Sequence, residues 1–283
     1  MSKRVATLFL QRNLPEITNK FAEHFLKWNG DVSDFYVIES GSDDDKLTDY
    51  HTFHANWEEA RTNGMHFPRG FNFGLLELHK LEKVLEKEYD YIVLAMGDTT
   101  LYDEHTIEVM VQQMDKHERM AILAPHLPYH DVNSQPDFAN NEDRLIAHTL
   151  MPHVFWMFRK EYMNDVINDN NDGTFMGYFY DGTNFRGYDT DTELILKAYQ
   201  GDWFFGVTDL VKHYEISDLT EKNYKVMKTQ EFSLHKDLMF NEGLEWLQAK
   251  YGFENKHRMR SLVNAHYSDF FNKHENLRWL AIW

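Results

Sequence analysis

The amino-acid sequence predicts an α/β fold with a mostly parallel central sheet flanked by helices and a helical C-terminal extension. Residues 5–125 alternate short apolar runs with segments whose apolar residues recur at helical spacing. The runs are continuous, as in strands that are buried on both faces of a sheet. After residue 215 the apolar residues keep only the helical spacing. At 283 residues, the chain suits one large domain, or one domain with an appendage.

Composition and charge exclude several classes of protein. Apolar residues make up 42% of the chain and aromatic residues 15%, which is enough for a sizeable core. The formal net charge of −17 argues against non-specific binding to nucleic acid or to an anionic membrane. The chain has no cysteine, so disulfides and thiolate metal sites are ruled out. No apolar run is long enough for a signal peptide or a membrane span, so we expect a cytoplasmic protein.

The elements of the first half follow in order. A strand over residues 5–10 leads into a helix that Asn13-Leu14-Pro15-Glu16 opens. A second strand at 35–38 ends on the acidic turn 39–45, and helices follow at 57–61 and 75–85.

The run from Tyr89 to Met96 is the clearest predicted strand, and Asp98 follows its carboxyl end. Ligands of α/β sheets collect at the carboxyl ends of strands, where Asp98 would suit a divalent metal or a substrate hydroxyl. The alternative is that Asp98 and Thr99 cap the helix predicted over 103–118. A strand at 120–124 comes next.

The second half begins with a polar loop over 126–145, which is long for a simple connection. A strand at 153–158, a helix at 159–167, a helix that ends at Tyr199 and a strand at 203–207 follow. The chain has no P-loop, serine-nucleophile elbow or dinucleotide glycine motif. Acidic clusters at 39–45, 98 and 189–193 favour a metal–diphosphate site, because Mg²⁺ and Mn²⁺ bind few protein carboxylates there.

Six short segments of this chain occur in an informative order. They are Asn13-Leu14-Pro15-Glu16, Glu39-Ser40-Gly41-Ser42-Asp43-Asp44, Asn63-Gly64 with Gly70-Phe71-Asn72-Phe73-Gly74, Met96-Gly97-Asp98-Thr99, Asp191-Thr192-Glu193-Leu194 and Val211-Lys212-His213. This order resembles that of the GT-A fold glycosyltransferases, in the family-2-like group with rhamnosyltransferase-like enzymes, over about residues 5–215. Two positions depart from the pattern: Met96 stands at the first metal-motif position, and Glu39 stands where Asp is usual.

The resemblance implies a metal-dependent, inverting glycosyltransferase, a hexosyl- or pentosyltransferase. It would move a sugar from a nucleoside-diphosphate-sugar, with UDP the expected nucleotide, to the hydroxyl of a saccharide acceptor, with Mn²⁺ or Mg²⁺ as cofactor. The implied domains are a catalytic domain at 1–215 and the helical extension at 216–283. The catalytic domain divides into a nucleotide-sugar-binding half at 1–125 and an acceptor-side half at 126–215.

The resemblance also assigns residues to roles. Asp98 and His213 would bind the metal, and Asp191 would be the general base, with Asp189 and Glu193 as alternatives because the motif aligns in more than one register. His153 and Trp156 would lie at the acceptor, unless Trp156 belongs to the core. Contacts to the nucleotide-sugar are expected from Leu10, Asn13, Glu39, Ser42, Asp44, Arg69, Asn72, Gly97 and Asp98.

Two other functions remain open. The same fold could transfer a sugar to a modified nucleic-acid base, although the net charge argues against this acceptor. A non-catalytic protein would bind the nucleotide-sugar without hydrolysis or transfer, a possibility that Met96 suggests.

Overall fold

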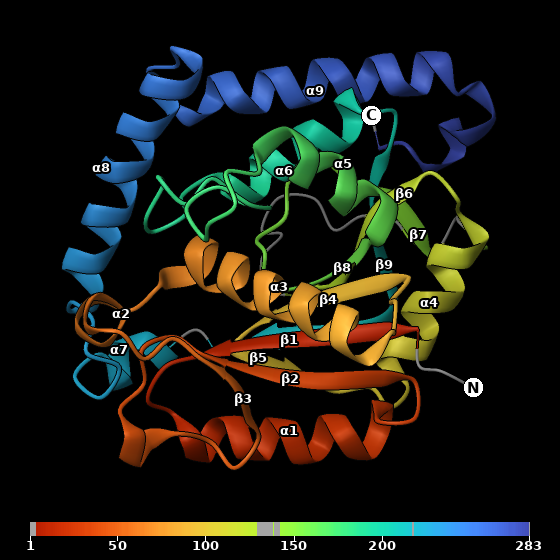
Figure 1. Ribbon diagram of the computed structural model, residues 1–283. Helices are drawn as coiled ribbons and strands as arrows, with labels where there is room; N and C mark the ends of the chain where they lie inside the picture. The colour runs from red at the N-terminus through yellow and green to blue at the C-terminus, as the bar shows by residue number, and fades with distance from the viewer. Residues whose placement is uncertain (1–3, 129–137, 139–141, 217, 283) are drawn as a thin grey trace.

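The computed structural model describes residues 4–128, 138, 142–216 and 218–282 (Figure 1). Within these residues nine strands form one sheet in the order β3-β2-β1-β4-β8-β6-β9-β5, and β7 also pairs with β9. The strands are β1 (Val5–Gln11), β2 (Ser33–Glu39), β3 (His51–His54), β4 (Tyr91–Met96), β5 (Thr99–Leu101), β6 (Met120–His126), β7 (Leu145–Ala147), β8 (Phe155–Arg159) and β9 (Phe204–Glu215).

The sheet is parallel in its first part and mixed in the rest. Strand β1 pairs in parallel with β2 and with β4, and β2 pairs in parallel with β3, as expected for residues 5–125. Strand β8 lies between β4 and β6 and is antiparallel to both. The expected α/β class is therefore confirmed, but the sheet is mixed because a later strand separates β4 from β6.

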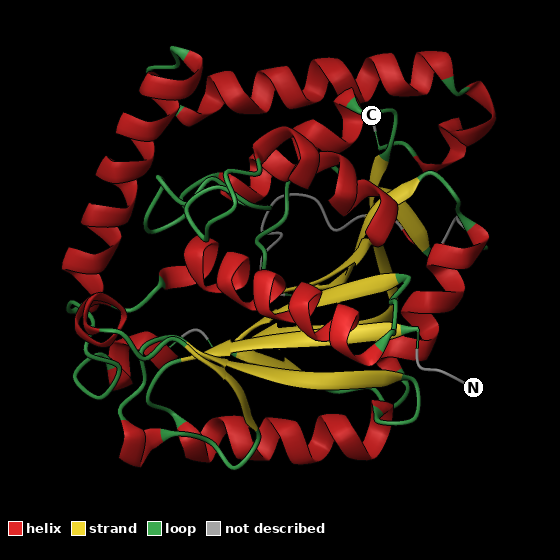
Figure 2. Ribbon diagram, viewed as in Figure 1, coloured by secondary structure: helices red, strands yellow, loops and turns green. Residues whose placement is uncertain are grey.

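Helices cover both faces of the sheet (Figure 2). They are α1 (Pro15–Asn29), α2 (Glu58–Asn63), α3 (His66–Leu85), α4 (Thr106–Lys116), α5 (Lys160–Asn170), α6 (Thr190–Gln200), α7 (Leu219–Asn223), α8 (Phe232–Tyr251) and α9 (Lys256–Lys273), with short 3₁₀ turns at Asp44–Lys46 and Glu275–Leu280. Alternate residues of β1 face opposite helices: Phe9 stacks on Phe21 of α1 at 4.4 Å, whereas Leu10 faces Gly70 of α3. A Cβ at Gly70 would lie 2.7 Å from Leu10 Cδ1, so glycine permits this close packing.

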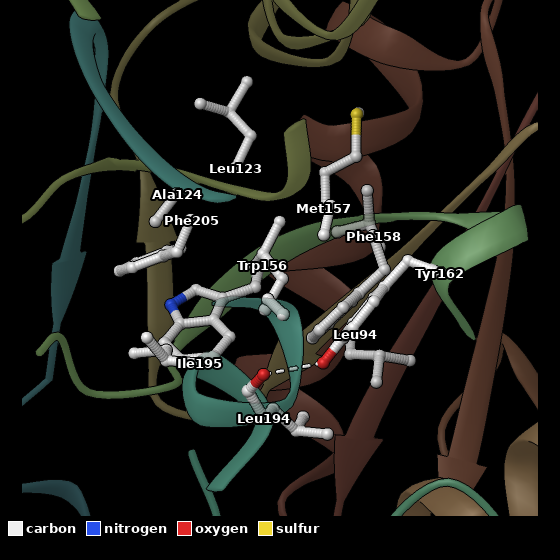
Figure 3. Close-up of a cluster of buried hydrophobic side chains, with 14 of the residues drawn as sticks. Leu94, Leu123, Ala124, Trp156, Met157, Phe158, Tyr162, Leu194, Ile195 and Phe205 are labelled. Atoms are coloured by element: carbon white, nitrogen blue, oxygen red, sulfur yellow. Dashed lines mark hydrogen bonds between the residues drawn. The ribbon is translucent and has the colours of Figure 1, made fainter. Parts of the chain in front are cut away.

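The core lies where β4, β8, β6 and β9 meet the helices (Figure 3). Trp156 of β8 is fully buried there, with its ring centroid 5.0 Å from that of Phe205. Tyr162 of α5 donates a hydrogen bond of 2.7 Å to the Leu194 carbonyl of α6, which joins the two helices across this core. The structure thus places Trp156 in the core, the alternative considered for it above.

Strand β5 corrects one expectation about Asp98. Residues Thr99–Leu101 form a strand antiparallel to the end of β9, and α4 begins only at Thr106, with His105 as its N-cap. Asp98 and Thr99 therefore do not cap a helix. The pairing with β5 also explains why β9 extends to Glu215, well beyond the predicted end at residue 207.

The chain after β9 is helical, as expected. In Figure 1, α9 crosses the top of the molecule and α8 descends along one side toward α7 and α2. Helix α9 packs on α6, where the Tyr267 and Tyr199 rings lie 5.3 Å apart. None of the described helices is both long and apolar enough to cross a membrane. Of the loop predicted over 126–145, residues 129–137 and 139–141 lie outside the described residues.

Candidate functional site

Two cavities lie at the carboxyl ends of β1 and β4 and share a wall. The inner cavity has a volume of about 170 Å³, and the outer cavity has a volume of about 740 Å³, which is within the usual range for ligand sites. The residues that line both cavities are His66, Phe67, Met96, Asp98, Thr220 and His235. The two cavities therefore form one cleft, with Asp98 at their junction.

Asp98 follows the end of β4 and has an unsatisfied oxygen. Its Oδ1 is enclosed and has no hydrogen-bond partner among the described residues. Burial, and next the negative charge of Glu215, raise the pKa of Asp98 to about 7. Glu215 lies close because Thr99, the neighbour of Asp98, pairs with it across β5 and β9. A bound cation would stabilise both carboxylates in their charged form.

These carboxylates fit a hard divalent cation. Asp98 and Glu215 both line the outer cavity, and oxygen ligands are those that Mg²⁺ and Mn²⁺ prefer. No group of three or more acidic, His or Cys side chains is placed to hold a metal within the described part of the chain. A metal here would therefore depend on phosphate and water for its other ligands. His213 of β9 is fully buried and lines neither cavity, so the structure does not bring it into the cleft with Asp98.

Asp191 lies in the first turn of α6 and lines the outer cavity. Its carboxylate accepts hydrogen bonds from the backbone N–H of Thr192, at 2.7 Å, and from that of His153. Burial, and next the charge of Asp189, raise the pKa of Asp191 to about 6 despite these hydrogen bonds. Asp191 is thus a carboxylate that can exchange a proton near neutral pH, as a general base must.

The two alternatives to Asp191 differ in their surroundings. Asp189 also lines the outer cavity, and its Oδ2 has no hydrogen-bond partner among the described residues. Glu193 lines neither cavity: it accepts a hydrogen bond from the Tyr251 hydroxyl and lies 2.8 Å from Lys250 Nζ. The cleft therefore contains Asp189 and Asp191 but not Glu193.

Three of the residues expected to contact the nucleotide-sugar line the inner cavity: Leu10, Gly97 and Asp98. Gly97 packs tightly against β1, since a Cβ there would lie 2.8 Å from the Leu10 carbonyl oxygen. The strand ends of β1 and β4 thus form one continuous wall of this cavity.

Glu39 is fully buried behind that wall. Its carboxylate accepts hydrogen bonds from the Thr48 N–H at 2.9 Å, from the Ser42 hydroxyl at 2.6 Å and from the Gln11 side-chain amide. Burial raises the pKa of Glu39. Glu39 and Ser42 line neither cavity, so in this arrangement they fix the turn after β2, and contact with a nucleotide remains a prediction.

Asn13 and Asp44 also lie outside the cavity walls. Asn13 accepts a hydrogen bond from the Asp43 N–H at 2.8 Å and donates one of 2.8 Å to the Val226 carbonyl. Asp44 is exposed and forms an ion pair of 2.7 Å with Arg61. Asn13 therefore holds the segment between α7 and α8 against the end of β1.

Asn72 of α3 holds the long loop that precedes α6. Its amide nitrogen donates to the carbonyls of Phe175 and Tyr180, and its oxygen accepts the N–H groups of Phe179 and Tyr180, all at 2.8–3.0 Å. These four bonds use the full capacity of the amide. Asn72 is thus occupied by the fold, and its predicted contact with the nucleotide-sugar is untested.

Arg69 is likewise engaged outside the cleft. It donates to the Gly182 carbonyl at 2.8 Å, lies 3.6 Å from a Glu59 oxygen and stacks on Phe185. Arg69 lines neither cavity.

His153 is the one expected acceptor residue that lines the outer cavity. Its Nε2 donates to the Leu94 carbonyl at 3.2 Å, so the neutral ring accepts at Nδ1 from the Tyr180 hydroxyl, 2.7 Å away. Burial lowers the pKa of His153 to about 3, which keeps it uncharged. Trp156 stacks behind His153 at 4.7 Å and lines neither cavity, so an acceptor sugar could not reach its ring.

Several cleft residues were not expected from the sequence. Arg12 lines the inner cavity, Glu215 the outer one, and the rings of His66 and His235 stack at 5.6 Å in the shared wall. Arg12 follows a predicted strand and could have been considered a cleft residue because of that position. Glu215 could not, because the second half of β9 was not predicted.

Comparisons with known proteins give a structural likeness only. No protein-family model and no curated protein matches this chain. Among solved structures the chain is similar to TarS of S. aureus: residues 1–349 of TarS align with a TM-score of 0.51 and 14% identity, over 99% of this chain and 83% of that one.

Two further TarS structures agree. TarS 1–349 in complex with UDP gives a TM-score of 0.51 and 15% identity over 88% and 72% of the two chains. A longer form of TarS gives 0.52 and 14% over 90% and 44%. The chain therefore has an α/β fold, with a mixed sheet flanked by helices, that is similar to the fold of TarS.

Proposed function

We propose that this protein is a metal-dependent, inverting glycosyltransferase that uses a nucleoside-diphosphate-sugar. The observation that carries the proposal is the cleft, in which Asp98 separates an inner cavity at the end of β1 from an outer cavity that contains Asp191. The fold supports it, because the similar TarS structure was determined in complex with UDP. UDP is therefore the nucleotide that we propose, whereas this likeness does not favour a rhamnosyltransferase-like subgroup.

Each side of the cleft would have its own task. The nucleotide would occupy the inner cavity, and the acceptor hydroxyl would approach through the outer one. Asp191, with its raised pKa, would take the proton of the attacking hydroxyl. Asp98 and Glu215 would hold Mn²⁺ or Mg²⁺, which would neutralise negative charge on the departing diphosphate. A saccharide acceptor is our proposal for the outer cavity.

A binding and turnover experiment tests this function. UDP should bind the purified protein in the presence of Mn²⁺, measured by calorimetry, and UDP-sugar should be hydrolysed slowly without acceptor. Asp191→Asn should retain UDP binding and lose acceptor-dependent transfer. If no nucleoside diphosphate binds, with or without metal, the proposal is wrong. Binding without any hydrolysis or transfer would instead support a non-catalytic nucleotide-sugar-binding protein.

A further inference from the structure

Arg12 is a buried cation in the wall of the inner cavity. It follows β1 directly, and only 7% of its surface is exposed. Nη2 donates to the carbonyls of Arg61, at 2.8 Å, and Thr62, at 3.3 Å, and Nη1 donates to that of Lys228 at 3.3 Å. Nε is enclosed and has no hydrogen-bond partner among the described residues. Three of the five N–H donors are therefore used, and the N–H of Nε and one N–H of Nη1 have no partner among the described residues.

The charge of Arg12 is not balanced by an adjacent carboxylate. Among the described residues no carboxylate oxygen lies within 4.0 Å of its nitrogens, and the nearby Asp43 is paired with Lys228 instead. Backbone carbonyls contribute only partial charges. A buried cation without a counter-ion is costly to a protein, and a bound anion would offset that cost.

The position of Arg12 relates it to Asp98. Strands β1 and β4 are parallel, with Leu10 opposite Met96, so Arg12 and Asp98 each follow two residues beyond this pair. Both line the inner cavity. Gly64, which has a φ of +71°, leaves the space for the guanidinium, because a Cβ there would lie 2.6 Å from Nη1. The wall of the inner cavity therefore contains a cation just after β1 and a carboxylate just after β4.

We propose that Arg12 binds a phosphate of the donor diphosphate through Nε. The inference rests on the proposed function, because it names a residue for the same nucleotide site. Arginine makes strong, charge-assisted hydrogen bonds to phosphate and keeps its charge when buried. Arg69, which was expected to contact the nucleotide-sugar, is instead held by Gly182 and Glu59 and lines neither cavity.

The test compares ligands that differ in phosphate number. Calorimetry with Mn²⁺ would measure the affinity of UDP, UMP and uridine for the wild type and for Arg12→Lys and Arg12→Gln. We expect Arg12→Gln to weaken UDP binding at least tenfold, to weaken UMP binding less, and to leave uridine binding unchanged. The affinities of Arg12→Lys should lie between those of the wild type and Arg12→Gln. The matched control is Arg61→Gln, which removes an arginine that binds Asp44 and lines neither cavity; it should leave all affinities unchanged.

A second measurement uses the wild-type protein, so that it holds even if a variant fails to fold. In protein labelled with ¹⁵N, the Nε–H resonance of Arg12, assigned through bonds, should shift on addition of inorganic pyrophosphate and not of uridine. A shift with uridine alone, or equal losses for uridine and UDP in Arg12→Gln, would overturn the inference. If UDP binds the wild type and both variants equally, only the role of Arg12 fails. If UDP does not bind the wild type, the proposed function fails, and the pyrophosphate result still decides whether Arg12 binds a phosphate.

Discussion

Lys250 Nζ lies 2.8 Å from the carboxylate of Glu193 and joins the end of α8 to the first turn of α6. Glu193 is buried, with a side chain only 2% exposed, and also accepts a hydrogen bond from the Tyr251 hydroxyl. Lys250 lies 2.6 Å from Asp181 as well. Through these contacts Lys250 and Tyr251 fix α6, the helix that presents Asp191 to the cleft.

Replacement of Lys250 by Met should therefore destabilise the protein. The change leaves the buried Glu193 charge without its main partner, and we expect the free energy of unfolding to fall by about 3 kcal/mol. Urea denaturation measures this loss. The control is Lys273→Met. The Lys273 side chain is 64% exposed and pairs with Asp202, so its loss should lower the free energy of unfolding by only roughly 0–1 kcal/mol. Equal losses for the two variants would contradict a special role for Lys250.

The strands that consist of a continuous apolar run could be predicted from the sequence alone. Strands β1 and β4 are continuous apolar runs, and their parallel pairing follows from the helices between them. Strand β5 has three residues, two of them threonine, and owes its structure to pairing with the end of β9. A contact between segments more than 100 residues apart leaves no local pattern, so both the short strand and the true length of β9 were missed.

The residues of the candidate site likewise divide into those that the sequence could identify and those that depend on distant contacts. Asp98 could be selected because it follows a visible strand end, and Asp191 through the motif that resembles the glycosyltransferases; both line the cleft. Glu39 is the last residue of β2, yet its side chain turns toward Thr48 and Ser42 rather than the cavity. The direction of a side chain at a strand end depends on what packs around it. For Arg12 that environment comes from α2 and from the segment before α8, which no local pattern connects to β1.

The pH dependence of transfer should report the raised pKa of Asp191. A general base acts when deprotonated, and burial raises the pKa of Asp191 to about 6. Acceptor-dependent turnover should therefore be nearly constant above pH 7 and fall about tenfold for each pH unit well below 6. Initial rates with saturating donor between pH 4.5 and 8.5 would show this. A rate that stays flat down to pH 4.5 would exclude Asp191 as the base.

Asp189→Asn should move the pH at which turnover begins to fall to a lower value. The negative charge of Asp189 is the second cause, after burial, of the raised pKa of Asp191, so its removal makes Asp191 easier to ionise. Relative to the wild type, the variant should keep a larger fraction of its maximal rate at pH 5. Loss of all activity in Asp189→Asn, with UDP binding retained, would instead identify Asp189 as the base.

The last prediction concerns which residue of β9 binds metal together with Asp98. His213 is fully buried and lines neither cavity, whereas Glu215 lines the outer cavity and its charge acts on Asp98. Mn²⁺ affinity, measured by electron paramagnetic resonance with UDP present, should fall at least tenfold in Asp98→Asn and severalfold in Glu215→Gln. The matched control is Asp103→Asn, which changes another carboxylate near β5 that lines neither cavity.

His213→Gln decides between the two residues of β9. In the part of β9 that pairs with β5, His213 lies opposite Leu101 and Glu215 lies opposite Thr99. Because His213 is buried and lines neither cavity, His213→Gln should leave Mn²⁺ affinity unchanged in protein that melts cooperatively. A loss of Mn²⁺ affinity in that variant, with Glu215→Gln unaffected, would restore the ligand set expected from the sequence. It would also mean that metal and nucleotide binding rearrange the end of β9.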